Sequence, residues 1–201
     1  MTRKEQLDNE ISNIWDIYLI GKESFDYAHY LYNPRTTIEK NYLAIHRDFS
    51  FIRFILFRNS IIELSKLFHD RDIEKCNIHK LLKKFKRNQI YGDLFQDKMK
   101  ISEWEALIIN NGELIKKITT LRDKVYSHLD PTFRDKIDLE FEDVGRLFEI
   151  VKDIIITIYE HTFDTYADLE NIYFDKDRFN LIDILSKEWE RKKNGIINPL
   201  I

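Results

Sequence analysis

Apolar residues recur every three or four positions along most of the chain, which is the pattern of amphipathic α-helices. The first such segment runs from about Thr2 to Leu31 and ends near Pro34, which disfavours helix at the residue before it. A second runs from about Ile38 to His69. It is so densely apolar around "FSFIRFILFRNSIIELSKLF" that we expect it to be a central helix, covered on most sides.

The same pattern predicts four further helices. A short one begins at about Ile78, where Asn77 is a suitable N-cap. After a loop that holds at most one helical turn, a longer one runs from about Ser102 to Leu129, with a candidate interruption at "NNG" and an end forced by Pro131. The last two cover 141–165 and 178–193, the latter capped by Asn194 and Gly195.

Composition supports one helical domain. The 201 residues are 43% hydrophobic, enough for one core, and only 5 Gly and 3 Pro interrupt the helical pattern. We find no internal repeat and no linker. The predicted fold is therefore all-α: an antiparallel bundle of five to six helices that forms a single domain over 1–201.

Charge and cysteine content narrow the possible functions. With 32 basic and 35 acidic residues the net charge is −3, so a nucleic acid would have to be met by a local basic patch. Cys76 has no partner cysteine and no apolar run reaches the roughly 20 residues that cross a bilayer, so we expect a cytoplasmic protein without a membrane partner. The histidines lack HxxxH or HExxH spacing, and no phosphate-binding glycine loop or nucleophile elbow occurs, so we predict no metal and no cofactor.

An arginine interrupts the apolar face of the helix that ends before Pro131. At about 100° per residue, Leu121, Val125 and Leu129 fall within about 60° of Ile118, and Arg122 lies near +40°. A buried guanidinium cannot lose its proton. It therefore needs a carboxylate, a hydrated subunit boundary or a bound anion.

His128 lies near −80° on the same wheel, about 120° from Arg122, so one regular helix does not aim both side chains at one point. They converge if the last turn unwinds before Pro131, or if a second copy of the helix faces the first across a twofold axis.

The stretch "LRDKVYSHLD" resembles the motif of the HEPN superfamily of small helical-bundle proteins: an arginine, four to six variable residues and a histidine. Arg122, "DKVYS" and His128 match it, with Asp123 as the polar residue after the arginine. Together with the preceding "SIIELSKLFHDRD", this stretch is most similar to the abortive-infection branch of the superfamily. The resemblance covers about Asp48 to Thr165, within a motif-bearing core of about 38–165.

The resemblance implies a homodimer whose two motifs form one cleft through the Arg122/His128 helix, and, in catalytic members, metal-independent RNA cleavage. The ribose 2'-hydroxyl attacks the adjacent phosphate, a step that needs a base and an acid. Histidines suit both roles at neutral pH, and an arginine stabilises the phosphate. We expect the two His128 copies to transfer protons and the two Arg122 copies to hold the phosphate. Bacterial antiphage defence or a toxin–antitoxin system, with a possible antitoxin partner, is the implied setting.

Asp123 departs from the Asn that family members very often carry after the arginine. A carboxylate there can orient Arg122 or raise the pKa of His128, but it adds negative charge beside RNA. Two alternatives to the enzyme remain. One is a non-catalytic HEPN-like module that binds RNA, a nucleotide or a protein, and the other is an antitoxin or scaffold with no nucleic-acid role. The structural alternative for the motif is an arginine paired with a neighbouring carboxylate and a histidine at a helix C-terminus.

A basic helix offers the best local patch for RNA. Lys80, Lys83, Lys84 and Arg87 are predicted on one side of it, opposite an apolar side, and Lys124 is a lesser candidate beside His128. A solvated charged face explains the same pattern without RNA.

Overall fold

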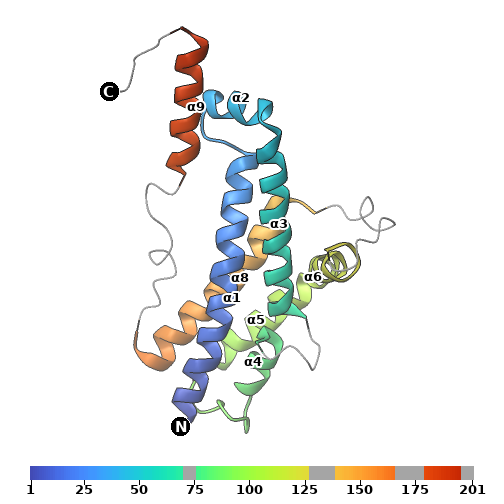
Figure 1. Ribbon diagram of the computed structural model, residues 1–201. Coiled ribbons are helices and arrows are strands. Elements are labelled where there is room, and N and C mark those ends of the chain that lie inside the picture. Colours follow the sequence, from blue (N-terminus) through green and yellow to red (C-terminus); the bar gives the residue numbers. More distant parts are fainter. Residues whose placement is uncertain (70–75, 127–138, 166–178, 196–201) are drawn as a thin grey trace.

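The computed structural model describes residues 1–69, 76–126, 139–165 and 179–195. Within these ranges the protein is all-α: eight α-helices and two π-helical segments, with no strand (Figure 1). His128, part of the predicted motif, lies outside the described residues.

Two long helices form the axis of the molecule. Helix α1 (Arg3–Tyr32) and helix α3 (Arg47–Phe68) pack antiparallel along most of their length (Figure 1). Helix α1 begins where predicted, because Thr2 and Glu5 form a capping box that satisfies two terminal N–H groups. Gly21 permits the close packing, since a Cβ there would lie 3.1 Å from both the Cβ of Glu63 and a ring carbon of Phe148.

The single helix predicted over 38–69 is instead two helices, and this corrects the expected boundaries. Helix α2 (Thr37–Ile45) ends at His46, whose backbone is extended (φ −95°, ψ 95°), and α3 starts at the next residue. No Pro or Gly marks the break. It lets α2 pack against helix α9 (Asn180–Lys193) while α3 runs back along α1 (Figure 1).

Three short helices follow α3. Helix α4 (Ile78–Lys84) begins after Asn77, whose side chain accepts from the Lys80 N–H at 3.2 Å, as the sequence predicted. Helix α5 (Lys98–Asn110) starts earlier than expected because Asp97 caps it. It ends at the predicted interruption, and helix α6 (Gly112–Thr120) follows.

The later elements match the predicted segments closely. Helix α8 (Phe141–Ile158) continues into the π-helical segment η2 (Tyr159–Phe163). Helix α9 ends at Asn194, and Gly195 adopts a left-handed conformation (φ 70°), as expected for a C-terminal cap.

The buried apolar residues form two groups of very different size. The main core joins α1, the second half of α3, α4, α5, α6 and α8, with the fully buried Ile14, Leu64, Phe95, Trp104 and Phe148 among its members. The small cluster consists of Tyr30, Leu31, Leu43 and Ile182, where α2 and α9 meet the end of α1.

Helix α3 is covered over only part of its length, contrary to the expectation that it would be covered on most sides. In its second half Ile61, Leu64 and Leu67 are fully buried, whereas in its first half Phe51 is 66% and Phe54 44% exposed. Helices α1, α6, α8 and α4 pack on α3, but its first turns reach beyond the main core. High apolar content alone did not establish burial.

Candidate functional site

The arginine of the motif lies where the winding of its helix changes. Helix α6 ends at Thr120, and residues Leu121–Tyr126 continue as the π-helical segment η1. A π-helical turn closes at i→i+5 and is wider than an α-helical turn, so the angles expected for a regular helix from Ile118 to Leu129 do not apply beyond Leu121. Leu121 is 6% exposed and anchors the start of this segment in the main core.

The Arg122 side chain is largely buried, with 12% of its surface exposed. Its Nε donates to the Asp123 Oδ1 at 2.9 Å, and its Nη2 is hydrogen bonded to the Nδ1 of His69. One edge of the guanidinium is thus held by an adjacent carboxylate and another by an imidazole from the end of α3. These contacts fix its orientation and offset part of the loss of hydration.

His69 is part of the site although no sequence pattern singled it out. Because a guanidinium has donors and no acceptor, the His69 Nδ1 is the acceptor of this contact. The residue caps the C-terminus of α3, and its carbonyl accepts from the Nδ2 of Asn77. His69 meets Arg122 only because the end of α3 packs beside η1 in the folded chain, and no local sequence pattern predicts that packing.

Asn77 connects this site to the basic helix. Its side chain is fully buried, bonds to the His69 carbonyl, and caps α4 through the Lys80 N–H. A short series of hydrogen bonds therefore runs from Arg122 through His69 and Asn77 to the start of α4. The predicted cationic helix is thus linked to the arginine of the motif through two intervening residues.

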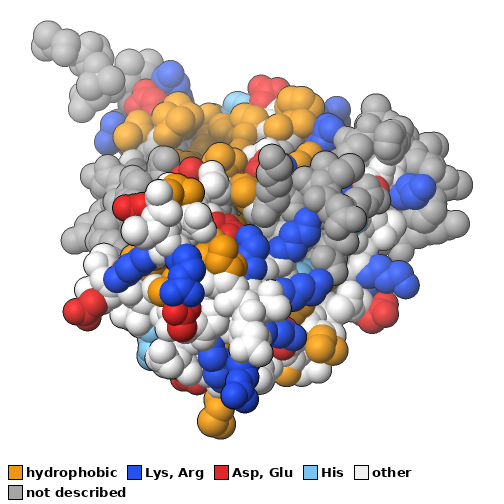
Figure 2. Space-filling model, turned by 90° about the horizontal axis from the view of Figure 1, so that it is seen from below, with side chains coloured by type: hydrophobic (Ala, Val, Ile, Leu, Met, Phe, Trp, Pro, Cys, Tyr) orange, Lys and Arg blue, Asp and Glu red, His pale blue; other side chains and the backbone are white. Residues whose placement is uncertain are grey.

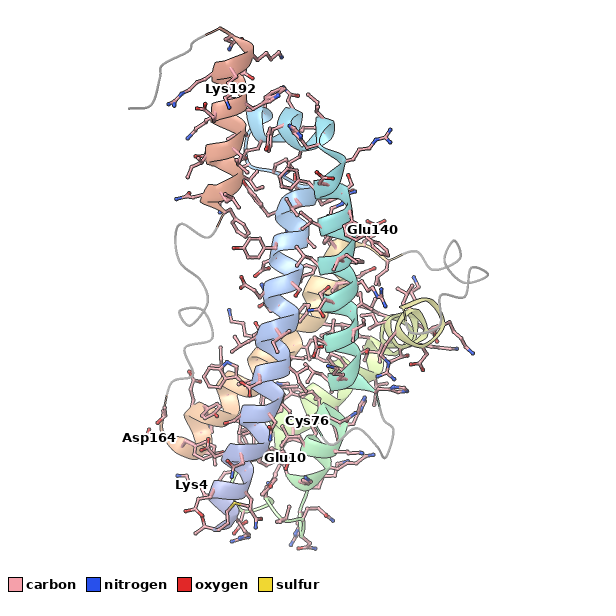
Figure 3. The ribbon with its side chains drawn as sticks, in the orientation of Figure 1. Lys4, Glu10, Cys76, Glu140, Asp164 and Lys192 are labelled. Carbon is pink, nitrogen blue, oxygen red and sulfur yellow. The ribbon has the colours of Figure 1, made fainter. Side chains whose placement is uncertain are left out.

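The basic residues of α4 and the following turn do not all point outward. Lys83 and Arg87 are exposed and Lys80 is half-buried. Lys84, expected on the same outer side, instead forms an ion pair with Glu10 of α1 at 2.8 Å. Figure 3 labels Glu10 where α1 passes α4. The apolar side of α4 packs as expected, since Leu81 is fully buried.

The end of the molecule that carries α4 has a mixed but cation-rich surface. Figure 2 views the molecule from this side, and Lys and Arg side chains spread across it with a few acidic groups between them. Lys86 pairs with Glu105 at 2.8 Å and lines a hollow of about 220 Å³ between α4 and α5. Lys124, on η1, is exposed.

Tyr91 closes the same region against α1. It is 3% exposed, and its hydroxyl donates to Glu10 at 3.1 Å. Burial, together with the negative charge of Glu10 and this hydrogen bond, raises the pKa of Tyr91 to about 12.

The predicted partner of Arg122 in the motif, His128, lies outside the described residues, as do the side chains of Val125 and Tyr126. Arg122 and Asp123 are in contact, and the basic helix lies nearby through His69 and Asn77. In the described part of the chain, no three or more His, Cys, Asp or Glu side chains are grouped closely enough to hold a metal ion. None of the described helices has the length and apolar content that crossing a bilayer demands.

Comparisons of the chain with protein-family models, with curated proteins and with solved structures give no match.

Proposed function

We propose that this protein is a metal-independent endoribonuclease of HEPN type, with an active site that two copies of the chain share. It acts in the bacterial cytoplasm, in antiphage defence or as the toxin of a toxin–antitoxin pair with a protein antitoxin. The proposal rests on the match of Arg122 and His128 to the family motif. The observation that carries it is the placement of Arg122: a largely buried cation, oriented from two sides, at the start of a π-helical segment.

A fixed guanidinium suits phosphate chemistry. Charge develops on the phosphate oxygens as the 2'-hydroxyl attacks, and donors already in position stabilise that charge without reorganisation. Asp123 and His69 supply this preorganisation by holding Arg122. π-Helical segments often occur at functional sites.

Proton transfer is assigned to His128. One His128 takes the proton of the 2'-hydroxyl and its twofold mate gives a proton to the leaving 5'-oxygen, since an imidazole titrates near neutral pH. Lys83 and Arg87, exposed on and beside α4, bind flanking RNA phosphates, with Lys80 and Lys124 as lesser contacts.

The ion pair of Arg122 with Asp123 favours one alternative function, that of an RNA-binding module without catalysis. A carboxylate 2.9 Å from Nε competes with an incoming phosphate for the same cation. RNA would then be retained but left intact.

The test is incubation of the purified full chain with mixed RNA in the presence of a chelator. We expect cleavage products with 2',3'-cyclic phosphate ends, and a loss of rate of at least about 100-fold in Arg122→Ala and in His128→Ala. Lys116→Ala, exposed on α6, is the matched control and should cleave as the unmodified chain does. Arg122→Lys keeps the charge but loses the forked donor geometry, so it should also be slow.

Two further measurements make the result decisive. Thermal denaturation of each variant separates loss of activity from loss of fold, and sedimentation shows whether the active species is a dimer. Retention of RNA without cleavage supports the module. Cleavage that survives both Arg122→Ala and His128→Ala, or that belongs to a monomer, contradicts the proposed site.

A further inference from the structure

A second hollow lies at the opposite end of α3 from Arg122. The C-terminal end of α1, α2 and the first turns of α3 meet at one end of the molecule (Figure 1). Their side chains line an open hollow of about 180 Å³. Sixteen residues separate Arg53, which lines it, from His69, which contacts Arg122, so the two sites are about 24 Å apart along the helix.

The inner lining of this hollow is apolar and aromatic. Leu31 and Leu43 belong to the small cluster and are each 8% exposed. Tyr32 and Phe49 also line the space; Tyr32 is 59% exposed, and Phe49 is half-buried. The Tyr32 ring already stacks on Phe141, with ring centroids 4.9 Å apart, so the apolar surface open to a second ring is that of Phe49 and the two leucines.

Two cations line the same hollow, Lys40 from α2 and Arg53 from α3, and no acidic residue does. Among the described residues, neither cation has a carboxylate within ion-pair distance. By contrast, Lys84 of α4 forms an ion pair with Glu10 of α1 at 2.8 Å. The Arg53 guanidinium instead lies 5.6 Å from the centre of the Tyr32 ring. Two cations that line one apolar space, without a carboxylate partner in the described part of the chain, give it a local positive potential that suits an anion.

The volume of the hollow limits its ligand to a small molecule. Drug-sized sites span roughly 300–1,000 Å³, whereas a cavity of about 150 Å³ accommodates one benzene ring. A hollow of about 180 Å³ therefore takes one aromatic ring with a compact charged group.

We propose that this hollow is a binding site for a small aromatic anion, a single ring that bears a carboxylate or a phosphate. The ring packs against Phe49 and the apolar lining of Leu31 and Leu43, and the anionic group forms charge-assisted hydrogen bonds with Lys40 and Arg53. The hydroxyl of Ser50, also in the lining, adds one donor.

This proposal is independent of the proposed ribonuclease, because no residue of the hollow takes part in the Arg122 site. Occupation of the hollow would join α2 more firmly to α1 and α3, which α2 otherwise meets through few buried side chains. A bound ligand should therefore also raise the thermal stability of the chain.

The experiment titrates the full chain with four probes: phenyl phosphate, benzoate, inorganic phosphate and benzyl alcohol. Binding is followed by calorimetry and by shifts of backbone amide resonances of α2 and of the start of α3. Phenyl phosphate and benzoate should bind at least about tenfold more tightly than either the ring without charge or the charge without ring. The stronger of the two identifies the anionic group.

Variants locate the site. Lys40→Gln should weaken binding of the better aromatic anion about tenfold, because it removes one charged donor, whereas Lys116→Gln on α6 should not change it. Ala44→Phe fills the hollow from an exposed position without removing a charge, and should abolish binding. Circular dichroism establishes that each variant folds.

Several results would overturn the proposal. If inorganic phosphate binds as tightly as phenyl phosphate, the hollow recognises only the charge. If benzyl alcohol binds as tightly as benzoate, it recognises only the ring. If Lys40→Gln and Lys116→Gln weaken binding of the anion equally, the loss of affinity comes from the net charge of the protein and not from this site. No binding of any probe at millimolar concentration would leave the hollow without a ligand of this class.

Discussion

The two ends of α3 show how differently the same kind of sequence is used. Toward its C-terminus, α3 lies in the main core, where α1, α4, α6 and α8 surround it and Leu64 is fully buried. Toward its N-terminus it meets α2 and the small cluster, and Phe51 and Ile52 are 66% and 43% exposed. The exposed first half is no less apolar in sequence than the buried second half, so the neighbouring helices, and not the apolar content, decide which half is buried.

At the edge of each region a tyrosine hydroxyl donates a hydrogen bond to a glutamate. At the edge of the main core Tyr91 donates to Glu10 at 3.1 Å, and beside the small cluster Tyr30 donates to Glu39 at 2.5 Å. Glu10 is neutralised by Lys84, whereas Glu39 is bound by the capping N–H of Thr36 at 2.8 Å. The small cluster thus depends more on polar bonds, because it buries fewer apolar side chains.

The largest expected effect separates the two apolar groups. Leu64→Ala should lower the free energy of unfolding by about 2–5 kcal/mol, since the surrounding helices cannot collapse onto the space left. Leu43→Ala, in the small cluster, should lower it by less than about 2 kcal/mol because a thin layer relaxes more easily. Urea titration measures both. Equal losses would show that the small cluster is as tightly packed as the main core.

The next effect is a pH dependence at the edge of the main core. Burial and Glu10 raise the pKa of Tyr91 from 10.0 to about 12, so the folded state keeps a proton that the unfolded state has lost over that interval. The stability that Tyr91 contributes is therefore complete below pH 10 and lost as pH rises toward 12. Its size should be about 1 kcal/mol at neutral pH.

Tyr91→Phe provides the measurement, because the difference in stability between this variant and the unmodified chain should shrink from pH 9 to pH 12. Tyr30→Phe is the matched variant beside the small cluster. Burial and Glu39 also raise the pKa of Tyr30. The stability difference between Tyr30→Phe and the unmodified chain should therefore also shrink as pH rises. A difference that stays constant with pH in both variants would show that neither hydroxyl titrates differently on folding.

The sequence predicted the helices well because local signals define them. Capping residues such as Thr2 and Asn77, and the Gly195 at the end of α9, act within one turn of the chain, so they can be recognised without the fold. The all-α class and most helix boundaries followed from these signals and from the apolar period.

The misses have a common cause, which is long-range packing. The break at His46 carries no Pro or Gly, and exists because α2 and α3 pack on different partners. The inward turn of Lys84 needs Glu10, which is 74 residues away in the chain.

The candidate site was predictable in part. The apolar ladder placed Arg122 at a buried face, where a guanidinium was expected to need a carboxylate, a hydrated subunit boundary or a bound anion. Asp123 supplies the carboxylate. The contact with His69 joins residues 53 positions apart, and the π-helical winding of η1 has no local pattern that we recognised. Whether Arg122 and His128 meet across two chains stays a prediction.

The smallest expected effect concerns the exposed half of α3. Phe51→Ala should change the free energy of unfolding by less than about 0.5 kcal/mol, because a side chain that is 66% exposed has little burial to lose. Phe68→Ala, at the buried end of the same helix and 2% exposed, is the matched comparison and should lose several-fold more. Thermal denaturation at two protein concentrations makes the pair informative. If Phe51→Ala loses more than about 1 kcal/mol, and the loss grows with protein concentration, another copy of the chain covers this face in solution. The difference in burial between the two halves of α3 would then hold for the isolated chain but not for the dimer.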